Sequence, residues 1–464
     1  MPAAQLLADL RALVGEHGVL TGEGLSGRAY DPQVGAVKAQ VLVRPADTAQ
    51  VAGVLRICHA RRQVVVPHGG LTGLVHGAAA GASDLILSLE ALNRIESVDV
   101  AGRTMRVGAG VTLQRVQEEA ERFDLMFPLD LGARGSATIG GNIATNAGGM
   151  RVLRYGMMRN LVLGVEAVLA DGTVLCSLNR MLKNNAGYDL KQLFIGTEGT
   201  LGVVTRADLR LAARPGTCSS AFVACRDFEG MIRLLGTLDA RLGGQLSAFE
   251  ALWPDFYEIT TTAPAPHPPL LPYGHGVYAL IEAQGADPGA DQERFEQVLA
   301  AALEDGAVVD AVIAKSDAQR RAMWAPREDV FQTRRHGPTH NFDVSLPIAA
   351  MPQYLDTARR ALAERVPAAR SFVFGHVADG NLHVIVSAGD AQAHAATFIE
   401  VERCIYEPLH RIAGSISAEH GIGLERKAYL HISRTAAEIA TMRALKSALD
   451  PRTILNPGKV IDVH

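Results

Sequence analysis

The sequence has little of what marks a secreted, membrane-spanning or nucleic-acid-binding protein. Its five cysteines form no CxxC pair, and no apolar run is long enough for a membrane span, which needs about 18 residues. Lysine and arginine number 45 against 49 acidic residues, with no block of like charges, so nucleic acid is not the expected main partner. Scattered cysteines suit a reducing compartment. We therefore expect a soluble, cytoplasmic protein.

Several familiar motifs are also missing. The nearest candidate for a Rossmann fingerprint, GAGVTL from Gly108, has Leu113 where the third glycine belongs. GxxxxGK[ST], HExxH and GxSxG do not occur. The sequence therefore gives no support for a Rossmann-type NAD enzyme, a P-loop NTPase, a zinc protease or a serine hydrolase.

A chain of 464 residues is long enough for two or more domains. Residues 41–67 read as strand, helix and strand, with Asp47 as the helix N-cap, and open a mixed α/β region. The pattern changes near Arg214, where strands and helices of a second α+β domain begin. We predict domains at 1–212 and 213–420, and a C-terminal helical segment, 421–464, that returns to the first domain.

Glycine is concentrated in two loops. The first, PHGGLTGLVHGAAAG, starts at Pro67 directly after a predicted strand. Glycines there let backbone amides turn inward and approach a phosphate closely. A tight turn would explain one such cluster equally well, but a second one, GARGSATIGGNIATNAGG from Gly132, adds hydroxyl and amide side chains. Together the two loops favour a pyrophosphate-containing ligand.

Four segments in order, PHGGLTGL, GSATIGGNIATNAGG, YGMMRNLVLGVEAVLADGTV and LFIGTEGTLGVVT, resemble the FAD-binding oxidoreductases of the vanillyl-alcohol oxidase (PCMH) type. The similarity is greatest to the branch that contains D-lactate and D-2-hydroxyglutarate dehydrogenases and the glycolate oxidase large subunit. It extends from about Val41 to Lys459. The resemblance implies an α+β protein: a two-part PCMH-type FAD-binding domain, and a cap domain with an antiparallel sheet.

The resemblance also implies the FAD contacts. Leu71 stands where related oxidases carry the histidine that links the flavin covalently, which favours noncovalent FAD, although His68 and His76 are nearby. The positions that match the family's FAD contacts are Pro67, Gly69, Gly70, Thr72, Gly73, Ser136, Thr138, Gly140, Gly141, Asn142, Gly148, Gly149, Tyr155, Glu198, Gly199 and Gly202.

A second functional element is the segment GHVADGNLH, in which His376 and His383 flank an Asp-Gly-Asn turn between two strand-like runs. A hairpin would bring both imidazoles to one side, although two such histidines alone are often only hydrogen-bonded core or surface residues. Glu419 could complete a site with two histidines and a carboxylate, or could be a helix-entry charge. The resemblance implies a divalent metal, usually zinc, on His376, His383 and Glu419.

These residues suggest a reaction. A 2-hydroxy acid could chelate the metal, His420 would accept the hydroxyl proton, and hydride would pass to flavin N5. Asn381 would hold the substrate hydroxyl or carboxylate, and Arg327 matches the family arginine that clamps a carboxylate. Electrons would leave to an external acceptor such as an electron-transfer flavoprotein, a quinone or a cytochrome. A homodimer is compatible with the resemblance.

The sequence departs from the 2-hydroxyglutarate pattern at Asn341, where a lysine is expected, and at Phe331, where a threonine is expected. Both changes favour a shorter or more apolar substrate tail, unless Arg334 or Arg335 compensates. D-lactate and D-2-hydroxyglutarate therefore both stay open as substrate classes. The alternatives are a glycolate oxidase catalytic subunit, a flavin-dependent transferase like the ether-lipid synthases, and a non-catalytic flavoprotein.

Overall fold

The computed structural model describes residues 4–25, 38–389 and 395–463, and the chain divides into two compact units. Unit 1 contains the described residues up to 149, residues 156–214 and the described residues from 419 onward. Unit 2 contains residues 150–155 and 215–418. Both combine helices with largely antiparallel sheets, so the predicted α+β class is confirmed.

Unit 1 begins with a four-stranded sheet in the order β1 (Val19–Thr21), β2 (Val41–Val43), β4 (Leu85–Ser88) and β3 (Val65–His68). Strands β2 and β3 both run parallel to β4. Helix α2 (Thr48–Arg61) connects β2 to β3, and the Asp47 carboxylate caps it by accepting from the Gln50 amide at 2.8 Å. The predicted strand, capped helix and strand are therefore confirmed, and the chain enters the first glycine loop at the end of β3.

The second sheet of unit 1 is antiparallel, in the order β5 (Ile95–Asp99), β6 (Thr104–Gly108), β10 (Val203–Arg210), β8 (Val162–Val168) and β9 (Val174–Cys176). A short pair, β7 (Leu125–Met126) and β11 (Ala212–Ala213), lies outside it. The remaining helices of this unit are α1 (Ala4–Val14), α3 (Leu113–Glu121), α4 (Ile139–Thr145), α6 (Met158–Leu161), α13 (Leu430–Ser433) and α14 (Ala436–Leu449).

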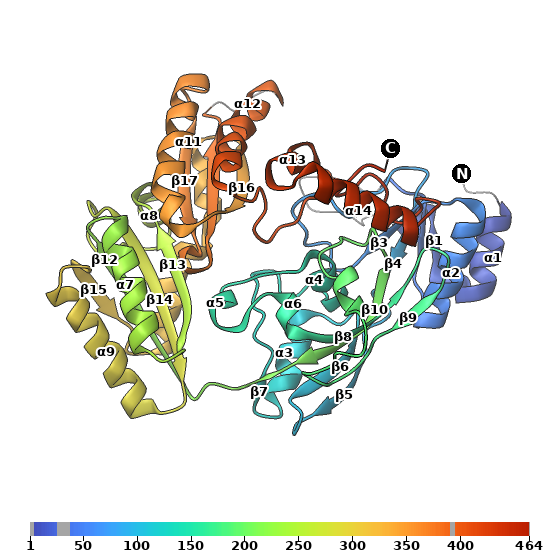
Figure 1. The fold of residues 1–464 in the computed structure, drawn as a ribbon, viewed down its shortest axis with the longest axis horizontal. Helices are drawn as coiled ribbons and strands as arrows, with labels where there is room; N and C mark the ends of the chain where they lie inside the picture. The colour runs from blue at the N-terminus through green and yellow to red at the C-terminus, as the bar shows by residue number, and fades with distance from the viewer. Residues whose placement is uncertain (1–3, 26–37, 390–394, 464) are drawn as a thin grey trace. The chain divides into compact units, whose positions relative to one another are not determined.

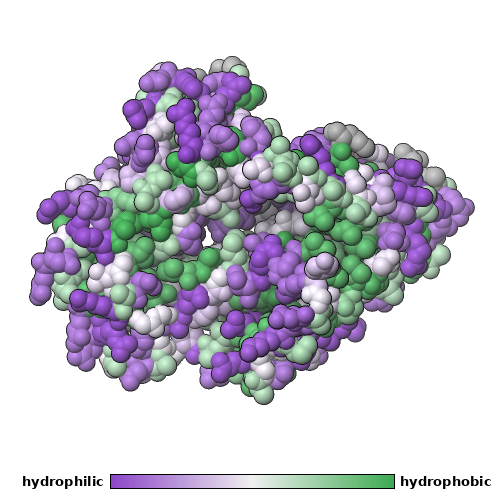
Figure 2. Space-filling model, viewed as in Figure 1, coloured by the Kyte–Doolittle hydropathy of each residue, from purple (hydrophilic) through white to green (hydrophobic). Residues whose placement is uncertain are grey.

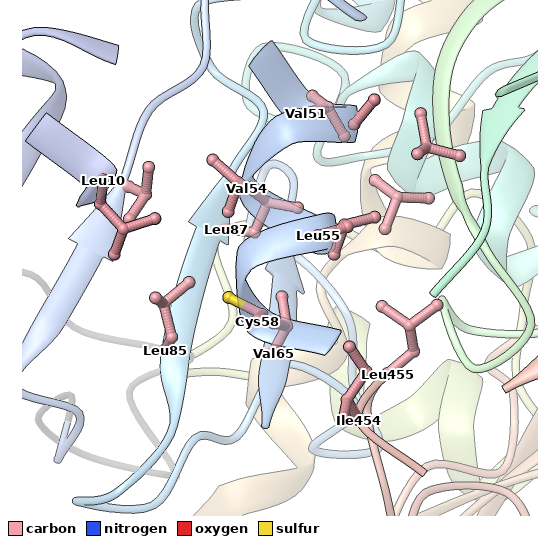
Figure 3. Close-up of a cluster of buried hydrophobic side chains, with 14 of the residues drawn as sticks. Leu10, Val51, Val54, Leu55, Cys58, Val65, Leu85, Leu87, Ile454 and Leu455 are labelled. Atoms are coloured by element: carbon pink, nitrogen blue, oxygen red, sulfur yellow. The ribbon is translucent and has the colours of Figure 1, made fainter. Parts of the chain in front are cut away.

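The C-terminal segment is part of the core of unit 1. Figure 3 shows Ile454 and Leu455 beside the apolar face of α2, with Leu85 and Leu87 of β4 in the same cluster. The amide of Val65 donates to the Ile454 carbonyl at 2.8 Å, so the tail also bonds to β3. Burial of these side chains, worth about 1.5–3 kcal/mol each, holds the tail against the strand that leads into the first glycine loop.

Unit 2 is built on a seven-stranded antiparallel sheet, in the order β15 (Asp310–Ile313), β12 (Thr217–Cys225), β14 (Val277–Gly285), β13 (Leu246–Leu252), β17 (Arg370–Gly375), β18 (Asn381–Ser387) and β16 (Thr339–Ser345). Its helices are α5 (Val152–Tyr155), α7 (Phe228–Arg241), α8 (Pro254–Thr261), α9 (Pro288–Glu304), α10 (Asp317–Glu328), α11 (Met351–Arg365) and α12 (Ala395–Tyr406). In Figure 1, α7 and α9 lie along one part of this sheet, and α11 lies beside α12.

Residues 150–155 differ from the predicted domain boundaries, because they interrupt the first domain and pack in unit 2. Helix α5 contacts β13, and the Tyr155 hydroxyl donates to Gln284 Oε1 at 3.1 Å. The Arg154 guanidinium donates to the Gln284 carbonyl as well. These contacts explain why the short helix leaves the surrounding glycine-rich chain.

On the face in view in Figure 2, hydrophilic residues cover α9, α11 and α12, as expected of amphipathic helices that bury one side against a sheet. Across residues 4–25, 38–389 and 395–463, no helix combines the length and the apolar character that a membrane crossing requires.

Candidate functional site

The first glycine loop leaves β3 with its backbone amides unsatisfied. Within the described part of the chain, the amides of residues 70–73 donate no hydrogen bond. The loop is held closely against the second glycine loop, because a Cβ on Gly70 would lie 1.9 Å from the Ser136 carbonyl oxygen. Gly73 instead faces open space, since a Cβ added to it would have no atom within 4 Å. Unpaired amides beside open space suit an anionic guest.

The second glycine loop leads into α4. The Thr138 hydroxyl caps this helix by accepting from the Gly141 amide at 3.4 Å, and Gly140 packs so tightly on Ala109 that a Cβ would lie 2.7 Å from the alanine methyl. Asn142 is buried, yet its Nδ2 finds no hydrogen-bond partner among the residues that the structure describes. A buried amide without a partner is costly, so this atom is suited to a ligand.

Glu198 organises the junction of three segments. Its carboxylate accepts from the amides of Ile422 at 2.7 Å and Gly423 at 3.0 Å, while Asn456 Nδ2 donates to the Glu198 carbonyl at 2.8 Å and to the Gly77 carbonyl at 3.0 Å. Burial raises the pKa of Glu198, and the two amides oppose that rise. The Glu198 side chain is therefore engaged inside the protein, where it orders the loops around it.

Most of the predicted FAD contacts lie in unit 1, on these loops. Tyr155 is the exception, because it belongs to unit 2. The unpaired amides of the first loop and the orphaned Asn142 amide fit a dinucleotide with a pyrophosphate. The segment after Ala418 is part of this region too, since a Cβ on Gly148 would lie 2.5 Å from Glu419 Oε2.

The predicted histidine hairpin is present in unit 2. Strand β17 ends at Gly375, His376 begins the turn, and β18 returns from Asn381. The rings of His376 and His383 lie with their centroids 5.3 Å apart. Register places Asp343 of β16 directly opposite His383. Because paired residues of neighbouring strands point to the same face, the carboxylate and the imidazole share one side of the sheet.

Four ligand-type side chains gather at the point where the chain leaves unit 2. Single ligand atoms of Asp343, His383, Glu419 and His420 all lie within 4.8 Å of one another. Glu419 and His420 directly follow Ala418, whose amide donates to an Asp343 carboxylate oxygen at 3.1 Å, so the chain itself keeps them close. Two imidazoles and two carboxylates are a donor set that suits zinc or a similar divalent ion.

The gathered set differs in composition from the predicted one. His383 and Glu419 are common to both, whereas His376 stands outside the group and directs its Nδ1 to a carboxylate elsewhere. Asp343 carried no signal in the sequence, since one aspartate in the strand THNFDVS looks like any half-buried strand residue.

Asn381 supports Asp343. Its Nδ2 donates to Asp343 Oδ1 and to the Val344 carbonyl, both at 2.9 Å. Its Oδ1 has no partner among the described residues. In this arrangement the side chain can accept a hydrogen bond from a substrate hydroxyl but has no amide hydrogen left to donate.

Glu250, on β13, is a further buried residue that sequence reasoning missed. One of its carboxylate oxygens accepts from His376 Nδ1, and the other accepts from Arg327 Nε at 2.8 Å. Burial alone would raise the pKa of Glu250, but the neighbouring His376 and Arg327 outweigh it and lower the pKa to about 2. The Arg327 guanidinium also lies over the Phe374 ring, 4.4 Å from its centroid.

The residues expected to bound the substrate tail occupy η4 (Val330–His336) and β16. Phe331 is exposed, and the Arg334 guanidinium stacks on its ring at 4.9 Å. Arg335 donates to the carbonyls of Thr262 at 3.2 Å and Ala263 at 3.1 Å after the end of α8. Arg335 is therefore engaged with the backbone after α8. Of the two arginines, Arg334 is the one that lies beside Phe331.

Comparison with known proteins identifies the family that shares these features. Residues 39–177 match the family model described as FAD binding domain, and residues 214–460 match FAD linked oxidases, C-terminal domain. The fold is similar to that of p-cresol methylhydroxylase (TM-score 0.77, 17% identity, 99% of this chain and 97% of that one). It is also similar to alkyldihydroxyacetonephosphate synthase (TM-score 0.74, 16% identity, 98% and 86%). Loops, fold and family matches together define an FAD-dependent oxidoreductase of the PCMH type.

Relatives indicate the group within this class to which the chain is similar. The chain is 39% identical to the mitochondrial D-2-hydroxyglutarate dehydrogenase of Bos taurus over 92% of this chain and 77% of that protein. It is 40% identical to the D-2-hydroxyglutarate dehydrogenase of Xanthomonas citri pv. viticola, over 90% and 89% respectively. The chain therefore belongs to the FAD-linked oxidase family, in the group of the D-2-hydroxy-acid dehydrogenases. The predicted resemblance is confirmed.

Proposed function

We propose that this protein oxidises a D-2-hydroxy acid to the 2-oxo acid with the help of a divalent metal. The observation that supports it best is the group formed by Asp343, His383, Glu419 and His420, whose ligand atoms lie within 4.8 Å of one another. A divalent metal held by these residues would supply Lewis-acid chemistry, which lowers the pKa of a substrate hydroxyl. FAD, when bound, supplies the acceptor for the hydride from C2.

Residues of the chain would hold the metal, accept the proton and bind the substrate. His383, Asp343 and Glu419 would hold the metal, with His376 as a further candidate ligand beside them. His420 is also one of the four gathered side chains, but we assign it to the hydroxyl proton and not to the metal, because an imidazole that does not bind the metal can act as the general base. Asn381 Oδ1 would accept a hydrogen bond from the substrate. Arg327 would hold a carboxylate with its two terminal nitrogens.

Dehydrogenation is favoured over the transferase alternative by sequence. Identity to D-2-hydroxyglutarate dehydrogenases is 39–40%, whereas alkyldihydroxyacetonephosphate synthase shares the fold at 16% identity. Within the dehydrogenase group, Phe331 and Asn341 reduce the polar contacts available to a second carboxylate. We therefore propose a substrate with a shorter or more apolar tail than 2-hydroxyglutarate, with D-lactate as the reference compound.

The test is anaerobic bleaching of the bound flavin by a panel of D- and L-2-hydroxy acids, before and after treatment with a chelator. Rapid bleaching by a D-acid that stops on metal removal and returns with added zinc supports the proposal. Bleaching that is unaffected by complete metal removal would refute the role of the metal. Fastest bleaching by D-2-hydroxyglutarate would refute the shorter tail, and no bleaching by any acid would refute the activity.

Electrons are proposed to leave the reduced flavin to an external carrier, an electron-transfer flavoprotein, a quinone or a cytochrome. The five cysteines are unpaired in the structure, which supports a reducing compartment such as the cytoplasm. Reoxidation of the bleached protein by each type of carrier would identify the acceptor.

A further inference from the structure

Glu250 joins two groups to which the proposed function gives different tasks. Its side chain is 1% exposed, and each oxygen has one partner: Oε1 faces His376 Nδ1 and Oε2 faces Arg327 Nε. The three residues come from distant parts of the sequence. Strand β13 pairs with β17 so that Ala251 is opposite Gly375, and Glu250 and His376 are the residues next to that pair. Arg327 reaches Glu250 from the C-terminal end of α10.

The contact determines which nitrogen of His376 carries the proton. A carboxylate can only accept hydrogen bonds, so Nδ1 must be the donor. In the neutral ring the lone pair is then on Nε2. A carboxylate that fixes an imidazole in this way is the usual support for a histidine that binds a metal through its other nitrogen.

The same carboxylate fixes the plane of the Arg327 guanidinium. Nε is occupied by Glu250, and the central guanidinium carbon lies over the ring of Phe374. The two terminal nitrogens make no hydrogen bond to another described residue. They form the end of the guanidinium that can hold a carboxylate through two parallel hydrogen bonds.

We propose that Glu250 is a positioning residue that sets the Nδ1–H tautomer of His376 and directs the terminal nitrogens of Arg327 toward the substrate carboxylate. One carboxylate thereby aligns the metal side and the substrate side of the site. The substrate half of this inference rests on the proposed function, whereas the histidine half does not require turnover.

Glu250→Gln tests the inference, because the isosteric amide offers one acceptor and one donor. It cannot accept from both neighbours, so either His376 changes tautomer or Arg327 loses its partner. The control is Asp208→Asn. Asp208, on β10, is also fully buried and lies between two cations, with Arg106 at 2.8 Å and Arg180 at 3.4 Å, but it has no place in the proposed site.

Three measurements separate positioning from general destabilisation. The first is the ¹⁵N-histidine spectrum of the holoprotein, with the His376 signals assigned by their loss in His376→Gln. The second is zinc affinity from competition with a chelating dye. The third is the steady-state pair of KM and kcat for the best D-2-hydroxy acid. Melting temperature is followed in every variant.

We expect Glu250→Gln to shift the His376 nitrogen signals, to weaken zinc binding by about 10–100-fold, and to raise KM at least about 10-fold, the factor for one weakened contact of 1.4 kcal/mol. Asp208→Asn should lower the melting temperature but leave all three readouts within about twofold. If Glu250→Gln matches Asp208→Asn in all three, the inference is refuted. If the wild type oxidises no hydroxy acid, the proposed function fails, while the spectrum and zinc affinity still decide the histidine half.

Discussion

Replacing Gly73 by alanine should separate the proposed FAD contact from the packing of the protein. A Cβ at this position would meet no atom within 4 Å, and the backbone there is not in the left-handed region. The apoprotein should therefore keep its stability to within about 1 kcal/mol. If the cofactor's pyrophosphate lies against this loop, the added methyl group should cost about one hydrogen bond to a charged group, 1.5–3 kcal/mol. The dissociation constant for FAD should then rise by about 10–150-fold.

Two neighbouring glycines provide the comparison. At Gly70 the Cβ would lie 1.9 Å from the Ser136 oxygen, so the loops must separate, and Gly70→Ala should lose both stability and FAD. Gly132, the first residue of the second glycine loop, also has no atom within 4 Å of a Cβ but is not among the predicted FAD contacts, and Gly132→Ala should change neither stability nor FAD affinity. The assay is titration of flavin-free protein with FAD, followed by the quenching of flavin fluorescence, with a melting curve for each variant. Unchanged FAD affinity in Gly73→Ala would refute the assignment of this loop.

Other parts of the structure give further predictions. Cys176 alone is exposed among the five cysteines, all of which are described, and burial raises the pKa of Cys58 to about 12. The native protein should therefore react rapidly with Ellman's reagent at one thiol. Fast reaction of several thiols would contradict the packing. Lys446 is buried and bonds to Asp450, so Lys446→Met should destabilise the protein by about 3–5 kcal/mol in urea unfolding; a loss below about 1 kcal/mol would show that the pair is dispensable. Because the pKa of Glu250 is lowered to about 2, its contribution to stability is present above pH 4.5 and lost as the pH falls toward 2; the stability difference from Glu250→Gln should shrink over that range, and a constant difference would contradict the shift.

Local patterns in the sequence were sufficient to predict the two glycine loops. Glycines that follow a strand, such as Gly69 and Gly70, indicate a tight turn or a close approach of the backbone, because glycine has no Cβ. The Asp47 cap and the turn between His376 and His383 are also short-range signals, and all are present in the structure. Tyr155 shows the limit of this approach, since its place in unit 2 depends on a hydrogen bond to Gln284, far along the chain.

The two carboxylates that sequence reasoning missed have no local signal at all. Glu250 lies in LSAFEAL and Asp343 in THNFDVS, both ordinary strand sequences with one acid each. Strand register makes them part of the site. It sets Asp343 opposite His383. It also sets Ala251 opposite Gly375, so that the adjacent residues Glu250 and His376 lie close together. Register depends on pairing between residues separated by 40 residues along the chain for the first pair and by 126 for the second, and no single segment encodes it.

Register also explains how one face of the sheet in unit 2 is both core and candidate site. Side chains alternate between faces along a strand, so Leu252 and Glu250 point the same way, as do Ile385 and His383. Leu252 and Ile385 pack in the apolar cluster with Phe374, while the two polar residues lie one step further along their strands. The apolar residues fix the pairing, because a slip by one residue would turn them to the other face. The stability of this core therefore also aligns Glu250 and His383 with their partners.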